Sequence, residues 1–351
     1  MTEARGEGVG EAVSEACCET FSEPGREAGR ERGLVSIVIP TFRRLHALLL
    51  AVASALGQTY PNVEVIVVSD GPDTEVRLAL EGMDPRLRYL ELAVNSGPAE
   101  ARNVGVRASR GEWLTFLDDD DTMFPEKVEQ QIRLADGNQP RKMISCRTVY
   151  RHDGQDDVWP QRPLQVDEDV ADYILLRPSL LGRPGVIQIQ TLLMHHSLLD
   201  AVPFTAHRDH EDWAWLLEVW HRAGARVEFA WKPLVVYNIV TESISRSRRA
   251  NWRDSLQWVE QYRLWIGDHA FTSFLASKVA MKAKRAGDWK ALREIAALVL
   301  HNKPRALDVM FLMGIALLPG FVLHAAWKRS LSAEESEAVV RSGRRNASEV
   351  V

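Results

Sequence analysis

The chain has 351 residues, of which 46% are hydrophobic and 26% charged, as in a soluble globular protein with a sizeable core. The formal net charge of −5 argues against a nucleic-acid-binding protein, which usually carries a basic excess. Only three cysteines are present, so the sequence excludes a disulfide framework and favours a reducing, cytoplasmic location.

The first 33 residues differ from the rest in composition. They hold eight Glu and four Arg but few large apolar residues, so they cannot bury enough surface to compensate for the entropy lost on folding. We therefore predict a disordered tail over residues 1–33. No apolar segment follows a basic start, so no signal peptide is predicted.

Short apolar runs alternate with helical patterns from Leu34 onward. The predicted strands are 34–40, 63–70, 87–92 and 111–121, and the predicted helices between them are 45–58, 74–82 and 98–109. This alternation is typical of βαβ units, and it predicts an α/β fold with a mostly parallel sheet flanked by helices.

The second half of the chain is less regular. A helix from Pro125 to Ala135 is followed by predicted strands at 144–150, 186–194 and 227–237, the last interrupted at Pro233, with a helix at 211–223. Residues 251–302 are helical in pattern throughout, which predicts a helical C-terminal extension.

One segment near the C-terminus, residues 309–327, has 19 residues without a formal charge. A membrane-spanning helix needs about 20 such residues, and basic residues flank this segment on both sides. We expect it to lie in the plane of a membrane. A buried helix pair and a true span remain alternatives.

Polar residues follow the predicted strands at the points where each strand ends. In open α/β sheets, ligands bind outside the carboxyl ends of the strands, so these residues are expected to converge on a site. They are Pro40 to Arg43, Ser69 to Gly71, Asn95 to Gly97, and Asp118 to Asp121.

The four consecutive Asp are the strongest single signal. Adjacent carboxylates repel one another unless a cation intervenes, and Mg²⁺ or Mn²⁺ takes one or two protein carboxylates with water and phosphate oxygens. Alternation along an extended chain places Asp118 and Asp120 on the same side. The alternative is a solvated acidic turn before the helix at Pro125.

Two other residues have open alternatives. Asp70 can accept a hydrogen bond from a nucleobase N–H, or it can form an Asx turn with Gly71. Arg102 can pair with phosphate, or it can point outward from a helix. The sequence contains no GxxxxGK[ST] phosphate-binding loop, and no GxGxxG follows the first strand.

Together these motifs resemble the family 2 glycosyltransferases, over about residues 34–245. The matching segments, in family order, are SIVIPTFRR (36–44), VEVIVVSDG (63–71), NSGPAEARNVG (95–105) and GEWLTFLDDDD (111–121). The resemblance implies an A-type nucleotide-diphospho-sugar transferase fold, which is a Rossmann-like, mostly parallel sheet. It also implies transfer of a sugar from a nucleotide diphosphate to an acceptor hydroxyl.

The resemblance assigns roles to individual residues. It implies that Pro40, Phe42 and Asp70 line the nucleoside pocket, and that Arg102 lies by the diphosphate. Asp118 and Asp120 would form the D-x-D element that binds Mn²⁺ or Mg²⁺, with Asp120 as the direct ligand. Asp118 and Asp119 would also contact the nucleotide sugar.

A second motif, Glu211-Asp212, looks like the family's acidic helix start. There Asp212 would be the general base that takes the proton of the acceptor hydroxyl. One base without an enzyme nucleophile predicts inversion at the anomeric carbon. The alternative is an acidic pair that only stabilises a helix N-terminus.

The sequence departs from the family at two positions. Ser69 stands where many members have another Asp, and Val240 stands where members often have a metal-binding His. The arginines at 246, 248 and 249 suggest a basic loop that closes over the diphosphate, with a solvated charge run as the alternative.

We therefore predict an inverting, metal-dependent glycosyltransferase of cell-envelope or exopolysaccharide synthesis. The donor is a nucleotide sugar, by default a UDP-sugar, and the acceptor is a saccharide or a lipid-linked saccharide. Residues 34–245 would form the catalytic domain, 246–330 a helical region and 331–351 a flexible tail. Residues 282–329 carry nine basic and three acidic residues, a net +6, which predicts contact with an anionic membrane at its cytoplasmic face. A saccharide-binding or membrane-scaffold protein and a sugar nucleotidyltransferase are the alternatives.

Overall fold

The computed structural model describes residues 30–135, 140–152, 155–180, 182–207, 209–238 and 251–318. The strands are β1 (Glu31–Thr41), β2 (Val63–Ser69), β3 (Leu87–Glu91), β4 (Gly111–Phe116), β5 (Thr122–Met123), β6 (Lys142–His152), β7 (Gln155–Trp159), β8 (Leu193–His195) and β9 (Arg226–Asn238). The helices of the sheet region are α1 (Leu45–Leu56), α2 (Thr74–Leu80), α3 (Pro98–Ala108), α4 (Lys127–Ile132), α5 (Val170–Leu175), the 3₁₀ turn η1 (Ile189–Thr191), α6 (His196–Ala201) and α7 (Glu211–Arg222).

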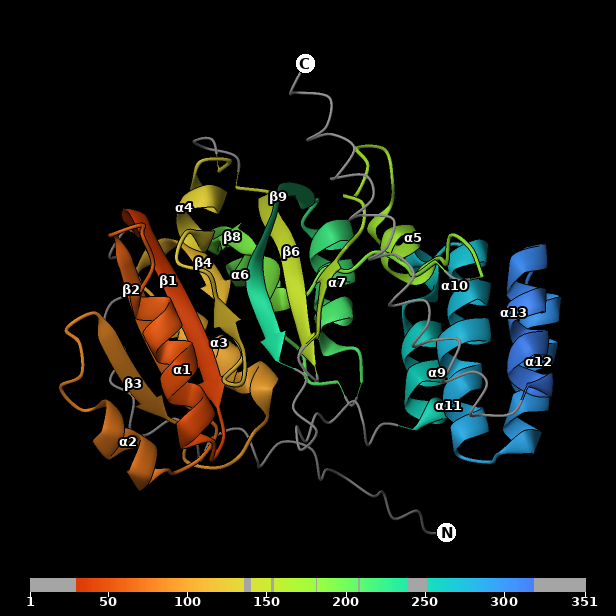
Figure 1. Ribbon diagram of the computed structural model, residues 1–351, viewed down its shortest axis with the longest axis horizontal. Helices are drawn as coiled ribbons and strands as arrows, with labels where there is room; N and C mark the ends of the chain where they lie inside the picture. The colour runs from red at the N-terminus through yellow and green to blue at the C-terminus, as the bar shows by residue number, and fades with distance from the viewer. Residues whose placement is uncertain are drawn as a thin grey trace, which may run out of the picture.

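The strands form one sheet in the order β3-β2-β1-β4-β8-β6-β9-β5, with β7 paired to β6 (Figure 1). Strands β3, β2, β1 and β4 are parallel, as are β6 and β9, whereas β5, β7 and β8 run antiparallel to their neighbours. The sheet is therefore mixed, and its first half matches the predicted parallel arrangement. The predicted α/β class is confirmed.

Both faces of the sheet are buried, because the inner strands are apolar on both sides. Ile37 and Val65 pack with α1, α2 and α4 on one face, whereas Val38 and Ile66 belong to the core on the other face, with α3 and α7. Helix α3 lies directly against β1. A Cβ built at Gly105 would lie 2.3 Å from Val38 Cγ1, so only glycine allows this approach.

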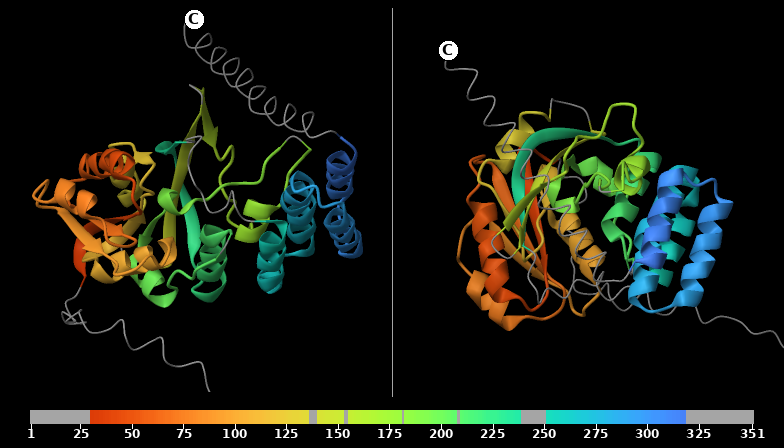
Figure 2. Two further views of the ribbon diagram at one scale, coloured as in Figure 1. Left: turned by 90° about the horizontal axis from the view of Figure 1, so that it is seen from below. Right: turned by 45° about the vertical axis from the view of Figure 1, so that its right-hand side comes forward.

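The C-terminal helices form a separate layer beyond α7 and α5 (Figure 2). They are α9 (Trp252–Gln261), the 3₁₀ turn η2 (Arg263–Trp265), α10 (Asp268–Phe274), the π-helical turn η3 (Leu275–Val279), α11 (Ala280–Arg285), α12 (Trp289–His301) and α13 (Ala306–Leu317). Segments α10, η3 and α11 follow one another without a break. The predicted helical extension is therefore present in the described residues 251–318.

Three element boundaries correct the sequence prediction. Strand β1 begins at Glu31, so residues 31–33 belong to the sheet rather than to the predicted tail, because Glu31 N–H donates to Arg110 O at 2.9 Å. Strand β4 ends at Phe116 instead of reaching the Asp run. Strand β9 continues through Pro233. The register of the β6–β9 pair shifts at Arg147, opposite Pro233, and at such an irregularity the sheet does not need the N–H that proline lacks.

The segment predicted as a strand at 186–194 is mostly irregular, with η1 at Ile189–Thr191 and only β8, Leu193–His195, as a strand. The sequence analysis did not predict β5, β7, α5 or α6, which are all short. Residues 1–29 of the predicted tail and all of 331–351 lie outside the described residues.

The apolar segment 309–327 is described only in part. Helix α13 begins at Ala306 and ends at Leu317, and residues 319–327 lie outside the described part of the chain. Among the described residues, none of the helices has the length and apolarity that crossing a membrane requires.

Candidate functional site

The ends of β1, β2 and β4 meet at one edge of the sheet. Thr41 pairs with Ser69, and Val38 pairs with Phe116, so the loops that follow these three parallel strands begin side by side. The N-terminus of α7 reaches the same edge through an ion pair of Glu211. The predicted site residues are therefore brought to one region by the fold.

Asp70 holds the loop that precedes α3. Its carboxylate accepts from Ser96 N–H at 2.6 Å and from Gly97 N–H at 2.9 Å, and its side chain is almost fully buried. Gly97 has a φ of +97°, a conformation that L side chains rarely adopt. Asp70 thus fixes the shape of the loop at the carboxyl end of β2 through bonds of longer range than the Asx turn with Gly71, which was the alternative to its predicted nucleobase contact.

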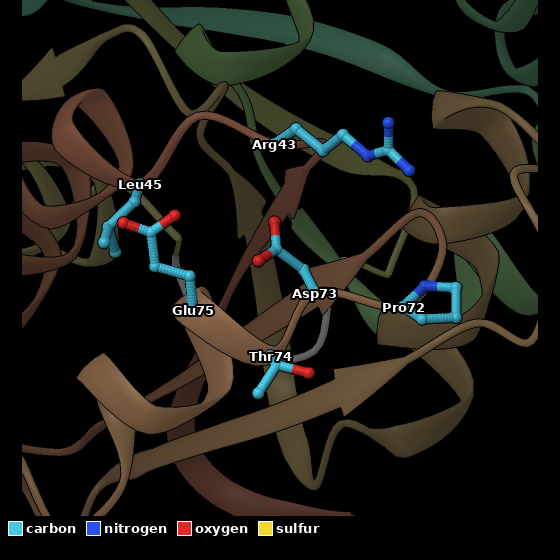
Figure 3. Close-up of a pocket in the computed structure, with 6 residues that line it drawn as sticks. All are labelled: Arg43, Leu45, Pro72, Asp73, Thr74 and Glu75. Carbon is cyan, nitrogen blue, oxygen red and sulfur yellow. The ribbon is translucent and has the colours of Figure 1, made fainter.

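Pro40 is buried within β1, whereas Phe42 is 41% exposed beyond the end of the strand. The Arg43 guanidinium lies 5.1 Å from the Phe42 ring centroid. An open pocket of about 320 Å³ adjoins these residues (Figure 3), and it is lined by Arg43, Leu45, Pro72, Asp73, Thr74 and Glu75. The sequence analysis did not single out this pocket, because its lining comes from two loops that are ordinary in composition.

The four Asp form a turn in which the side chains diverge. Asp121 N–H donates to Asp118 O at 3.1 Å, which closes the turn. The Asp119 carboxylate points inward, where it accepts from Thr41 Oγ1 at 2.8 Å and from Arg44 at 3.0 Å. Burial raises the pKa of Asp119 to about 6, even though Thr41 and Arg44 oppose the shift. Asp119 therefore anchors the turn to β1 and α1.

Asp120 and Asp121 have separate partners. Asp120 accepts from Arg44 at 2.9 Å. Asp121 is 1% exposed, and it accepts from Asn238 N–H at 2.9 Å and from Gln190 Nε2 at 3.0 Å. Burial raises the pKa of Asp121 well above its ordinary value. The end of β9 is thus tied to the acidic turn. Sequence reasoning assigned no role to Arg44, although it ends the motif SIVIPTFRR, and it missed Gln190, which lies in no recognisable motif.

Arg102 joins the two acidic motifs. Its guanidinium donates to Asp118 Oδ1 at 3.0 Å and to Glu211 Oε1 at 2.6 Å, and it lies 3.8 Å from Asp212 Oδ1. The Arg102 side chain is only 7% exposed. Burial alone would lower the pKa of Arg102, but the charges of Asp118, Asp212 and Glu211 outweigh it and raise the pKa. Arg102 is therefore a permanent cation between these carboxylates.

Asp212 is more accessible to solvent than its neighbour Glu211. Its side chain is 34% exposed, whereas that of Glu211 is 14% exposed. Burial of the carboxyl group raises the pKa of Asp212, Arg102 opposes this, and the charge of Asp118 raises it further. A carboxylate with a raised pKa at the rim of a site can accept a proton from a bound hydroxyl.

The acidic turn offers carboxylate ligands for a divalent metal. Asp118 and Asp120 are 30% and 21% exposed, and their oxygens are the hard donors that Mg²⁺ and Mn²⁺ prefer. The charge of Asp118 contributes to the raised pKa of both Asp119 and Asp120, and a cation would remove this repulsion. Within the described ranges, no group of three or more His, Cys, Asp or Glu is arranged as a metal site. The two carboxylates fit an ion whose remaining ligands are water and phosphate.

Two sequence expectations cannot be placed. Val240, which stands where family members often have a metal-binding His, lies outside the described residues, and so does the basic loop at 246–249.

Residues 36–200 match the sequence profile of Glycosyl transferase family 2. This region contains the ends of β1, β2 and β4 and the acidic turn. Residues 36–200 therefore form a family 2 glycosyltransferase domain. The Glu211-Asp212 pair lies beyond the matched segment, and Arg102 connects it to the matched segment.

Curated relatives agree with this family. An uncharacterized glycosyltransferase of Haemophilus influenzae is 30% identical over 186 residues, which are 53% of this chain and 62% of the relative. The succinoglycan biosynthesis protein ExoO of Rhizobium meliloti is 35% identical over 122 residues, 34% of this chain and 35% of the relative. The chain thus spans less than two thirds of the length of these relatives.

A solved structure has the same fold over most of its length. The mannosyltransferase PcManGT of Pyrobaculum calidifontis, in complex with GDP-Man and Mn²⁺, aligns with a TM-score of 0.54 and 15% sequence identity. The alignment covers 91% of both chains. The A-type glycosyltransferase fold with its curved mixed sheet and helical C-terminal region is therefore confirmed.

Proposed function

We propose that this family 2 glycosyltransferase moves a sugar from a nucleotide diphosphate to an acceptor hydroxyl with inversion of configuration. The observation that carries the proposal is the Arg102 guanidinium, which contacts Asp118 and Glu211 at 3.0 and 2.6 Å. It holds the acidic turn next to the acidic start of α7. A site with these two motifs side by side can bind a diphosphate and accept a proton in the same space.

The donor lies at the ends of β1 and β2 in this proposal. Phe42 offers an exposed ring, and Asp70 would shape the nucleoside pocket by holding the loop at Ser96 and Gly97. A UDP-sugar is the default donor from the sequence, although the mannosyltransferase with the same fold binds GDP-Man. The Asp118 side chain and the Asp119 backbone would flank the sugar-diphosphate in this arrangement.

Asp118 and Asp120 would hold Mn²⁺ or Mg²⁺, with Asp120 as the direct ligand. When bound, the ion neutralises the charge that develops on the leaving diphosphate. The likeness to a structure that contains Mn²⁺ supports this assignment. Arg44 would have to share Asp120 with the ion, because it now lies 2.9 Å from that carboxylate.

The chemical step uses Asp212 as general base. As the acceptor oxygen bonds to the anomeric carbon, its proton passes to the Asp212 carboxylate, and the bond from the anomeric carbon to the diphosphate oxygen breaks. Attack occurs on the face opposite the leaving group, so the configuration inverts. The positive charge of Arg102 limits the rise in the pKa of Asp212, because it opposes the effects of burial and of the Asp118 charge.

The acceptor is a saccharide or a lipid-linked saccharide of cell-envelope or exopolysaccharide synthesis. The similarity to a succinoglycan biosynthesis protein supports this class. We further propose that the C-terminal end contacts the cytoplasmic face of an anionic membrane. On helix α13, Met310, Met313 and Leu317 are 55%, 54% and 76% exposed to solvent. Basic residues lie on both sides of the 309–327 segment in the sequence.

The experiment is turnover of UDP- and GDP-sugars with Mn²⁺ or Mg²⁺, using Asp212→Asn, Asp120→Ala and the control Asp156→Asn. Asp156 is an exposed β7 residue paired with Arg151, so its variant should match the wild type. Asp212→Asn should lower kcat by about 10²-fold or more while UDP still binds. Normal turnover by Asp212→Asn would refute the base, and normal turnover by Asp120→Ala would refute the metal ligand.

A further inference from the structure

Four cationic side chains gather between the sheet region and the C-terminal helices. Arg177 and Arg183 lie in the segment after α5, and Lys278 and Lys282 lie on the continuous helix formed by α10, η3 and α11. The segment and the helix are in contact, since Arg177 N–H donates to Ser273 Oγ at 2.9 Å. The positive charges of Arg177, Lys282 and Arg183 all act on Lys278. We call these four residues the basic cluster.

Among the described residues, Lys278 and Arg177 have little counter-charge. Asp209 forms an ion pair with Lys282, and it also bonds to Ser255 and His210. For Lys278, Asp209 is the one carboxylate among the main described influences, and for Arg177 none is resolved. The cations around Lys278 repel its ammonium charge and so disfavour its protonated form. A bound anion would relieve this repulsion.

The basic cluster lies beside the proposed general base. Lys278 Nζ is 5.9 Å from the ring centroid of Trp213, the residue that follows Asp212. The Trp213 ring is held by His210, whose ring stacks on it at 4.9 Å with an interplanar angle of 4°. Lys278 itself is solvent-exposed. A group bound at Lys278 would therefore lie against the first turn of α7, the turn that also carries Asp212.

The other side of the basic cluster meets the apolar helix α13. The Arg177 guanidinium lies 4.3 Å from the ring centroid of Phe311 on α13. Met310, Met313 and Leu317 share one exposed face of this short helix. Cations next to an exposed apolar helix face match an amphiphile that has an anionic head and a hydrocarbon chain.

We propose that the basic cluster binds the phosphate or diphosphate of a lipid-linked acceptor, with Lys278 and Arg177 as its main contacts and α13 beside the lipid chain. This inference rests on the proposed function and selects the lipid-linked acceptor over a neutral saccharide. The head group lies at Lys278, the acceptor sugar extends along Trp213 toward Asp212, and the chain follows Met310 and Met313.

The test is binding of farnesyl diphosphate to the full chain in EDTA, below the concentration at which the lipid forms micelles. Inorganic pyrophosphate and farnesol are the comparison ligands, because each has one half of the amphiphile. The variants are Lys278→Met, Lys278→Arg and the control Lys290→Met, whose side chain is 89% exposed on α12. Wild type and Lys290→Met should bind farnesyl diphosphate more tightly than either comparison ligand.

Lys278→Met should weaken binding of farnesyl diphosphate by about tenfold or more, since a charge-assisted hydrogen bond is lost, whereas Lys278→Arg should keep most of it. Equal binding by Lys278→Met and wild type would overturn the proposal. So would equally tight binding of farnesol, which points to the apolar face alone, or of pyrophosphate, which points to a soluble phosphate.

A parallel titration with UDP and Mn²⁺ separates this inference from the proposed function. Lys278→Met should bind UDP as the wild type does, because Lys278 lies outside the donor residues. If Asp120→Ala abolished binding of farnesyl diphosphate in EDTA, the probe would occupy the donor site and the inference would be overturned. If UDP bound to none of the proteins while farnesyl diphosphate still bound in a Lys278-dependent way, that result would contradict only the assignment of a nucleotide-sugar donor.

Discussion

The Arg102 guanidinium lies 3.0 Å from the Asp118 carboxylate, so that α3 is fastened to the turn after β4. The same guanidinium reaches Glu211, 109 residues further along the chain. Sequence analysis expected Arg102 to pair with phosphate, and its observed partners are carboxylates. In this arrangement Arg102 orients the residues of the site, and the acidic turn and α7 cannot move independently.

Replacement of Arg102 should affect both stability and turnover. Lys cannot donate to two carboxylates in a planar arrangement, so Arg102→Lys should lower kcat/KM by about tenfold or more. Arg102→Met removes a buried cation that binds partly exposed carboxylates, so it should reduce the free energy of unfolding by about 1–3 kcal/mol. Urea unfolding and donor turnover measure the two effects. The matched control is Arg107→Met, an α3 residue that is 61% exposed, and equal losses in both variants would contradict the special role of Arg102.

Replacement of Asp70 tests the loop before α3. Asp70→Ala removes the acceptor for the N–H groups of Ser96 and Gly97, so we expect a loss of about 1–3 kcal/mol in the free energy of unfolding. The loop should also become easier to cleave by a protease, and KM for the donor should rise. Asp156→Ala, which affects an exposed pair with Arg151, provides the comparison. A protease-resistant loop in Asp70→Ala would show that other contacts hold it.

Lys127 makes stability depend on pH above neutrality. It is fully buried, donates to Thr115 Oγ1 at 2.8 Å, and burial lowers its pKa to about 8 from 10.5. Between these values the unfolded chain holds a proton that the folded chain has released, so stability rises as pH increases through this window. The shift corresponds to at most about 3 kcal/mol.

The measurement is urea unfolding from pH 7 to pH 9 for wild type and Lys127→Met. Wild type should gain stability over this range, whereas Lys127→Met should be more stable at pH 7 and show a smaller change. The range ends at pH 9, because burial raises the pKa of Cys146 to about 11 and that thiol acts in the opposite direction at higher pH. Parallel pH curves for the two proteins would contradict the assignment to Lys127.

The first half of the fold was predictable because its signals are local. The runs that became β1, β2 and β4 are apolar on both faces, and Pro98 and Gly97 mark the start of α3. The second half was harder, since β8 has three residues and η1 replaces most of a predicted strand. Such short elements depend on tertiary pairing rather than on any periodicity.

The candidate site divides in the same way. Asp118, Asp120 and Asp212 were found because carboxylates at the end of a strand or the start of a helix are visible in one segment. Their cationic partners were not predicted, because Arg44 and Arg102 meet them only after the chain folds. The inward direction of Asp119 also has no sequence signal, since it depends on the position of Thr41 across the sheet.

The close approach of Gly105 to Val38 has a consequence for how this sequence can change over evolutionary time. Any side chain at position 105 would displace α3, and Arg102 lies one turn earlier on that helix. A residue that never meets a substrate is therefore constrained as tightly as one that does. A larger residue at position 105 can be accommodated only after Val38 has been replaced by a smaller residue. The order in which these two substitutions arise therefore decides whether the intermediate protein stays active.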